Sequence, residues 1–165
     1  MGAMLSSKLR KFAGEYLHSL DSKNRVTVPR KWRFAGDDDD SAYLAIPQPV
    51  GYIWLCPPSI MEQLDEKLES ILPTDLEGLR FKMYLMKRSE MVYCDKSSRI
   101  VLTPELIKHA GLENQVQLVG MYGSWSIWNP ERYQKFEDNP LSLDIDEKGR
   151  RLLNVMGKIW KKEST

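Results

Sequence analysis

The sequence predicts a mainly β protein with helices, an α+β fold made of two tandem copies of one strand–turn–strand unit. The first observation is a motif that occurs twice, as Asp21-x-x-x-Arg25 and as Asp95-x-x-x-Arg99. Both the aspartates and the arginines of the two copies are 74 positions apart (95 − 21 and 99 − 25). The second observation is that a short helix, two strands and a proline-initiated helix follow each motif in the same order, which indicates an internal repeat.

Strands are predicted where polar and apolar residues alternate or where β-branched and aromatic residues are enriched. These segments are residues 15–20, 25–28, 43–46 and 52–56 in the first copy, and residues 91–93, 100–102, 116–121 and 125–128 in the second. Residues 21–24 have the composition of a turn, in which Asn24 tolerates a left-handed backbone. The tryptophans within the strand patterns, Trp54, Trp125 and Trp128, are expected in the core rather than on a base-stacking surface.

Helices are predicted where a proline or a capping residue opens an apolar pattern. Short helices begin at Pro29 and Pro104, and a longer one begins at Pro58 and ends at Pro73. The apolar face of that longer helix is expected to hold Met61, Leu64, Leu68 and Leu72.

Three further helices complete the prediction. Thr74-Asp75-Leu76-Glu77 has the pattern of a capping box and opens a helix to about Met86. Asn129-Pro130 starts another helix, and residues 149–162 form an amphipathic helix that needs an apolar partner surface. That surface can belong to the same chain or to a neighbouring subunit.

The repeat divides the chain into consecutive parts. They are an N-terminal arm with a tag remnant (1–13), a first unit (14–61), a helical linker (62–88), a second unit (89–136) and a C-terminal amphipathic tail (137–165). The acidic run Asp37–Asp40 is expected to be a solvated loop, and its role stays open.

Composition excludes several classes of function. The chain lacks an apolar run of about 20 residues, so we expect no membrane span, and it lacks a signal-peptide pattern, which favours a cytoplasmic location. Cys56 and Cys94 have no zinc-ligand spacing, and a contiguous acidic run lacks the alternation of a calcium loop. His18 and His109 are the only histidines, and each is expected to be a structural or surface residue rather than the base of a nucleophile–base pair. We therefore expect no enzyme activity, no cofactor, no metal and no small-molecule substrate.

The two motif arginines allow two interpretations. In the first, Asp21 pairs with Arg25 and Asp95 with Arg99, and the pairs only stabilise the turns. In the second, the planar guanidinium binds a phosphate or the O6 and N7 atoms of guanine in a major groove. Cations near Arg25 favour the first copy for nucleic-acid contact, namely Lys23, Arg30, Lys31 and Arg33, whereas the surroundings of Arg99 hold fewer.

Two stretches of the sequence, one around each motif, resemble a known family. The stretch Gly14-Glu15-Tyr16, His18 and Leu20-Asp21-Ser22-Lys23-x-Arg25-Val26-x-Val28-Pro29 is similar to the start of bacterial MraZ proteins. Asp95-x-x-x-Arg99-Ile100, Ala110-Gly111-Leu112, Val119-Gly120 and Ile127-Trp128 resemble their second half. Asn24 and Ser98 stand where the family usually has glycine, so the second turn is expected to differ from the first.

The resemblance implies two tandem SpoVT-AbrB units in a pseudo-twofold, double-split (swapped-hairpin) β-barrel. It also implies a nucleoid-associated transcriptional regulator that binds promoter repeats of its cell-division and cell-wall gene cluster as a ring-like homo-oligomer. Carried onto this chain, the DNA-binding residues are Lys23, Arg25, Arg30, Lys31 and Arg99, with Asp21 and Asp95 in structural roles. The alternatives are an antitoxin-like protein-interaction module, and a hydrolase or decarboxylase on a similar barrel.

Overall fold

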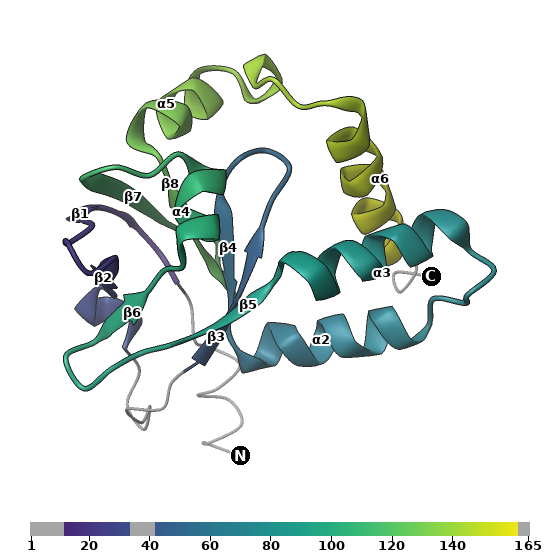
Figure 1. Ribbon diagram of the computed structural model, residues 1–165, viewed down its shortest axis with the longest axis horizontal. Helices are drawn as coiled ribbons and strands as arrows, with labels where there is room; N and C mark the ends of the chain where they lie inside the picture. Colours follow the sequence, from purple (N-terminus) through teal and green to yellow (C-terminus); the bar gives the residue numbers. More distant parts are fainter. Residues whose placement is uncertain (1–11, 34–41, 162–165) are drawn as a thin grey trace.

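The computed structural model describes residues 12–33 and 42–161 (Figure 1). The elements of the first half are β1 (Glu15–Ser19), β2 (Arg25–Thr27), η1 (Arg30–Trp32), β3 (Ala42–Pro47), β4 (Ile53–Cys56), α2 (Pro58–Glu69) and α3 (Leu76–Arg88). Those of the second half are β5 (Glu90–Tyr93), β6 (Arg99–Val101), α4 (Pro104–Ala110), β7 (Gln115–Gly120), β8 (Trp125–Trp128), α5 (Pro130–Asp138), η2 (Pro140–Ser142) and α6 (Glu147–Lys161). The predicted acidic loop Asp37–Asp40 lies outside the described residues, as do the start of the N-terminal arm and the last residues of the tail.

The strands form an antiparallel six-stranded sheet in the order β1-β7-β8-β4-β3-β5 and a separate two-stranded ribbon, β2 with β6. Exchanging the two halves of the chain leaves this pairing unchanged. The first strand of each half pairs with the third strand of the other, and β4 pairs with β8 at the centre. The α+β class is therefore confirmed, whereas closure into a double-split barrel remains a prediction.

The six-stranded sheet has a hydrophobic core on each face. Alternation along β3 places Tyr43 and Ala45 in one core and Ile46 in the other. The first core lies between the sheet and the β2–β6 ribbon and includes Trp32 and Trp125, whose ring centroids are 5.2 Å apart. Both tryptophans are buried, as is Trp128, so the expectation of core tryptophans is confirmed for Trp125 and Trp128.

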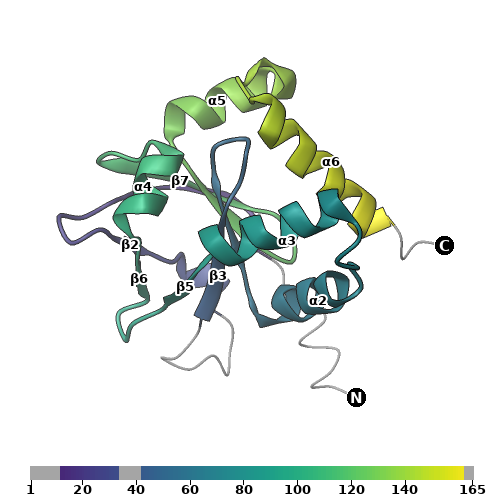
Figure 2. The ribbon, with the colours of Figure 1, turned by 45° about the vertical axis from the view of Figure 1, so that its right-hand side comes forward.

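Helices α2, α3 and α6 cover the other face of the sheet (Figure 2). Helix α3 contributes Phe81 and Leu85, and α6 contributes Leu152, to the second core. Trp160 of α6 also packs edge-on against the half-buried Trp54 of β4, and the ammonium of Lys67 lies 4.7 Å from the Trp160 ring centroid. The amphipathic tail therefore packs on its own chain.

Two local predictions were wrong. Leu72 is 66% exposed, because α2 ends at Glu69 and the periodic pattern does not extend to it. The residue that caps α3 is Asp75 rather than Thr74, since the Asp75 carboxylate accepts a hydrogen bond from the Gly78 backbone N–H at 3.0 Å. Because this aspartate sits one position closer to the helix, its carboxylate reaches the unpaired N–H groups first.

Candidate nucleic-acid interface

The Asp21 carboxylate organises the first turn. Its Oδ1 accepts hydrogen bonds from the backbone N–H groups of Lys23, at 2.9 Å, and Arg25, at 2.8 Å. Its Oδ2 accepts from Nε of Arg25 at 2.7 Å. Both the backbone and the guanidinium of Arg25 are thus held by one carboxylate.

The second turn repeats this arrangement. Asp95 Oδ1 accepts from the N–H groups of Ser97, at 2.8 Å, and Arg99, at 2.9 Å, and its Oδ2 accepts from Arg99 Nε at 3.2 Å. Asn24 and Ser98 have nearly equal left-handed φ angles, 61° and 64°. The expectation that the second turn differs is therefore wrong: the three hydrogen bonds to the aspartate compensate for the poorer left-handed tolerance of serine.

The same hydrogen bonds control the charge of the two aspartates. The backbone N–H of Arg25 is the largest influence that lowers the pKa of Asp21, partial desolvation opposes it, and the guanidinium adds to it. The backbone N–H of Arg99 lowers the pKa of Asp95 in the same way. Both carboxylates are therefore ionised at neutral pH and keep their arginines in place.

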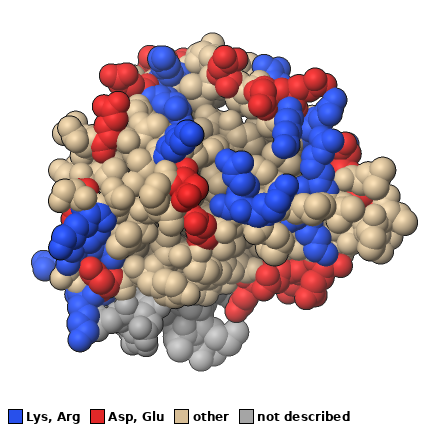
Figure 3. All heavy atoms as spheres, viewed as in Figure 1, with Lys and Arg blue, Asp and Glu red and all other residues tan. Residues whose placement is uncertain are grey.

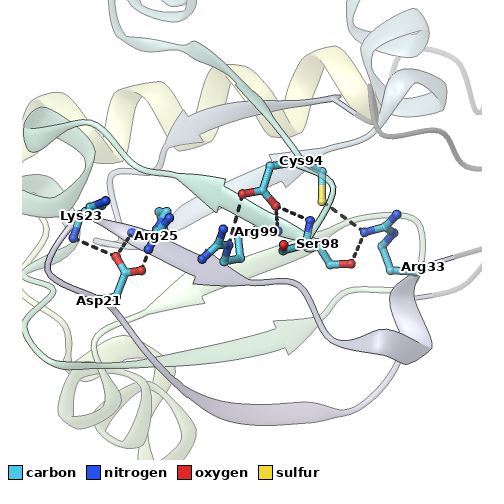
Figure 4. Close-up of polar contacts among 9 residues, drawn as sticks. Asp21, Lys23, Arg25, Arg33, Cys94, Ser98 and Arg99 are labelled. Carbon is cyan, nitrogen blue, oxygen red and sulfur yellow. Dashed lines mark hydrogen bonds and ion pairs between the residues drawn. The ribbon is translucent and has the colours of Figure 1, made fainter.

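The register of the ribbon brings the two motif arginines to one surface. Arg25 pairs with Val101, Thr27 pairs with Arg99, and the fully buried central pair between them faces the core. Because side chains alternate along a strand, these four residues share the outer face. Figure 4 shows the two guanidinium groups on the same stretch of ribbon, and diagonal neighbours of this kind lie about 7–8 Å apart.

Each guanidinium uses only part of its donor set. The Arg25 side chain is 26% exposed and that of Arg99 is 32% exposed. Nε is bonded to the aspartate in each, and no other described residue accepts a hydrogen bond from their terminal amino groups. The ion pairs of the first interpretation are therefore present, and they leave the terminal amino groups of both arginines available, so that nucleic-acid binding by these groups stays a prediction.

The remaining predicted cations lie at the ends of the ribbon. Lys23 is exposed in the first turn, and Arg30 and Lys31 are exposed on η1, directly after β2. Arg33 lies elsewhere: its guanidinium donates to Ser98 Oγ and to Cys94 Sγ and is not part of the outer face. The structure thus brings Arg25 and Arg99 together and separates Arg33 from them.

Two residues on the outer face were missed from the sequence. Thr27 is exposed and Val101 is 54% exposed, beside the two arginines. Thr27 and Val101 lie two residues after Arg25 and Arg99. Because residues i and i+2 of a strand share a face, this spacing could have predicted them from the sequence. A hydroxyl group and an aliphatic group are side chains that contact bases and thymine methyl groups in major grooves.

Other chemistry finds little support in the described residues. His18 Nδ1 and His109 Nε2 each lie 2.7 Å from a backbone carbonyl oxygen, of Thr27 and Gln48 respectively, as expected for structural histidines. Across residues 12–33 and 42–161, no three His, Cys, Asp or Glu side chains form a set that could hold a metal. None of the described helices is long and apolar enough to cross a membrane.

The fold and the ribbon define a protein in which two interlocked copies of one unit present paired arginines on a shared two-stranded surface. The family model described as "MraZ protein, putative antitoxin-like" matches residues 86–155. The Transcriptional regulator MraZ of Idiomarina loihiensis is 30% identical over 148 residues, which cover 87% of this chain and 94% of that protein. The proteins of the same name from Pediococcus pentosaceus (31% identity, 75% and 85% covered) and Heliobacterium modesticaldum (28% identity, 83% and 95% covered) are also similar. The chain belongs to the MraZ family.

Proposed function

We propose that this protein is a sequence-specific DNA-binding transcriptional regulator and not an enzyme, and that the β2–β6 ribbon is its DNA-reading element. The observation that carries the proposal is the pair of carboxylate-held arginine forks, Arg25 and Arg99, on the outer face of one ribbon. A two-stranded ribbon fits a B-DNA major groove, and a guanidinium binds guanine O6 and N7 bidentately. The names of the relatives as transcriptional regulators support the same function.

In this proposal the residues have separate roles. Arg25 and Arg99 read bases, while Lys23, Arg30 and Lys31 at the ends of the ribbon contact phosphates, which position the protein without reading sequence. Asp21 and Asp95 orient the arginines. A site pre-organised in this way loses less conformational entropy on binding.

One ribbon offers too few cations for tight binding at physiological salt. We infer that several subunits, assembled as a ring-like homo-oligomer, engage adjacent repeats in the promoter of the protein's own gene cluster on the nucleoid. Linked binding of this kind raises the apparent affinity without new contacts.

The test is a fluorescence-anisotropy titration of the protein's own upstream duplex with wild type, Arg25→Ala and Arg99→Ala. Each variant should weaken binding about 5- to 150-fold, as expected for loss of a bidentate base contact. Arg151→Ala is the matched control, because Arg151 also pairs with a carboxylate four residues away, Glu147 at 2.6 Å, but does so on α6. Light scattering establishes that subunit number is unchanged. Wild-type affinity in both ribbon variants would overturn the assignment.

The antitoxin-like alternative is kept because the description of the matching family model includes it. It predicts a stable complex with a small toxin through the tail, yet α6 already buries Leu152 against its own chain. Co-purification of a stoichiometric small partner, lost on deletion of α6, would favour this alternative.

A further inference from the structure

A second basic surface lies away from the ribbon. A groove of about 950 Å³ runs between α3, the start of α6 and the loops beside them. Its cationic lining residues are Arg80, Lys87 and Arg88 of α3 and Lys148 of α6. Figure 3 shows lysine and arginine side chains gathered over this part of the molecule and a separate group over the ribbon.

The acidic side chains that line the groove are too few to neutralise its cations. The acidic lining residues are Asp144 and Asp146, and Asp146 Oδ1 accepts the Gly149 backbone N–H at 2.7 Å, which caps α6. Within the described residues, no carboxylate forms an ion pair with Arg80 or Arg88. The groove lining thus contains four cations and two carboxylates, and one of these carboxylates, Asp146, already accepts a backbone hydrogen bond at the start of α6.

The spacing of the cations indicates the length of a ligand. Arg80 and Arg88 lie on one face of α3, eight residues apart, which corresponds to about 12 Å along a helix. Cationic groups spread along this length of the helix suit an elongated ligand with more than one anionic group. Arginine forks bind phosphate oxygens bidentately, which favours phosphate over a simple carboxylate.

Between the two arginines the wall is apolar and aromatic. Met83 and Tyr84 lie there, with Leu152 of α6 opposite. The Tyr84 hydroxyl donates to the Pro47 carbonyl, which fixes the ring, and the Arg88 guanidinium lies 5.8 Å from the ring centroid. Burial lowers the pKa of His109, which lines the same groove and is therefore neutral at neutral pH.

We propose that the α3–α6 groove binds a nucleotide-sized phosphorylated small molecule, with its phosphates at the cationic lining residues and its apolar body along Met83 and Tyr84. A groove of this volume with few converging polar groups has the properties of a small-molecule site. This site is distinct from the DNA-reading ribbon and does not depend on it.

The experiment is isothermal titration calorimetry of the full-length chain, without divalent metal, against the four ribonucleoside triphosphates, pyrophosphate and adenosine. At least one triphosphate should bind with a Kd below about 1 mM, which corresponds to roughly 4 kcal/mol of binding free energy. Adenosine should bind at least tenfold more weakly than ATP. No heat from any phosphorylated probe, or equal affinity for ATP and adenosine, would overturn the proposal.

Two variants locate the site. Arg80→Gln/Arg88→Gln should lower the affinity at least tenfold, whereas Lys82→Gln, on the same helix but outside the groove lining, should leave it unchanged. Arg25→Ala should also leave ligand binding unchanged, which separates this site from the ribbon. If the groove variant instead weakens binding to the upstream duplex and no probe binds, the groove is a second DNA contact and the ligand assignment is wrong.

Discussion

Arg33, in the first half of the chain, donates a hydrogen bond to the Ser98 hydroxyl in the turn of the second half. The position that corresponds to Arg33 in the second copy is Ile107, 74 residues later, which cannot make such a bond. The pseudo-twofold arrangement of the strands is therefore broken at this contact, and within residues 12–33 and 42–161 only the second turn accepts a side-chain hydrogen bond from the other half.

The first prediction concerns this contact. Arg33→Met keeps most of the aliphatic stem but leaves the Ser98 hydroxyl without its donor. The free energy of unfolding should fall by about 1.5–3 kcal/mol, the range for loss of a hydrogen bond to a charged group. Urea denaturation measures this change. Arg30→Met, at an exposed position of η1, should stay within about 0.5 kcal/mol of wild type, and equal losses in both would contradict the role of Arg33.

The second prediction concerns acid stability. The folded state lowers the pKa of Asp21 and of Asp95, so these groups stabilise the fold above the unfolded pKa of about 3.9, and that contribution is lost as pH falls through the lower folded pKa. Asp21→Asn/Asp95→Asn should therefore show a shallower decline of Tm than wild type between about pH 5 and pH 2. Thermal melts at a series of pH values test it, and parallel profiles would refute the linkage.

The third prediction concerns salt. Each phosphate contact contributes about 0.9 to the slope of log K against log salt. Replacing Lys23 by alanine should reduce that slope by about 1 per ribbon engaged, with affinity lowered similarly for specific and unrelated duplexes. Arg25→Lys keeps the charge but loses the fork, so it should instead relax sequence preference and preserve the slope. Identical behaviour of the two variants would contradict the separation of roles.

The fourth prediction concerns two glycines. A Cβ atom at Gly120 would lie 2.3 Å from the Phe12 carbonyl oxygen, so Gly120→Ala must displace backbone and should cost about 1–3 kcal/mol of stability. Gly157, inside α6, has no atom within 4 Å of such a Cβ. Gly157→Ala should therefore stabilise the protein, by about 0.5–1 kcal/mol, through lower entropy of the unfolded chain. Chemical denaturation of both variants tests the packing of β7 and the local openness of α6.

The strand order along the chain was predictable because its signals are local. Alternation places Val26 and Ile100 toward the core, and the prolines mark helix starts such as Pro58 and Pro104. The first turn was also predictable, because the Asp21 carboxylate accepts hydrogen bonds from the backbone N–H groups that follow it, whereas the left-handed backbone of Ser98 in the second turn was not expected. What failed locally was the end of α2, where Leu72 continues the pattern after the helix has stopped.

The partners of each element could not be predicted from the pattern alone. Nothing in the spacing of Arg25 and Arg99 says that their strands pair with each other rather than within each half. The inward position of Arg33 depends on a contact 65 residues away in sequence, and the α3–α6 groove depends on where the tail packs. Contacts of this range are set by tertiary packing, which leaves no periodic signal.

The exchange of partners between the halves has a consequence for synthesis of the chain. Among the described strands, β1 pairs only with β7 and β2 only with β6, so the first half leaves the ribosome with two strands that have no partner in that half. Loop closure over such separations is slow relative to local folding. A chain stopped after α3 would hold Arg25 but no ribbon to carry it. The proposed DNA surface therefore comes into existence late and all at once, when residues 99–120 have been made.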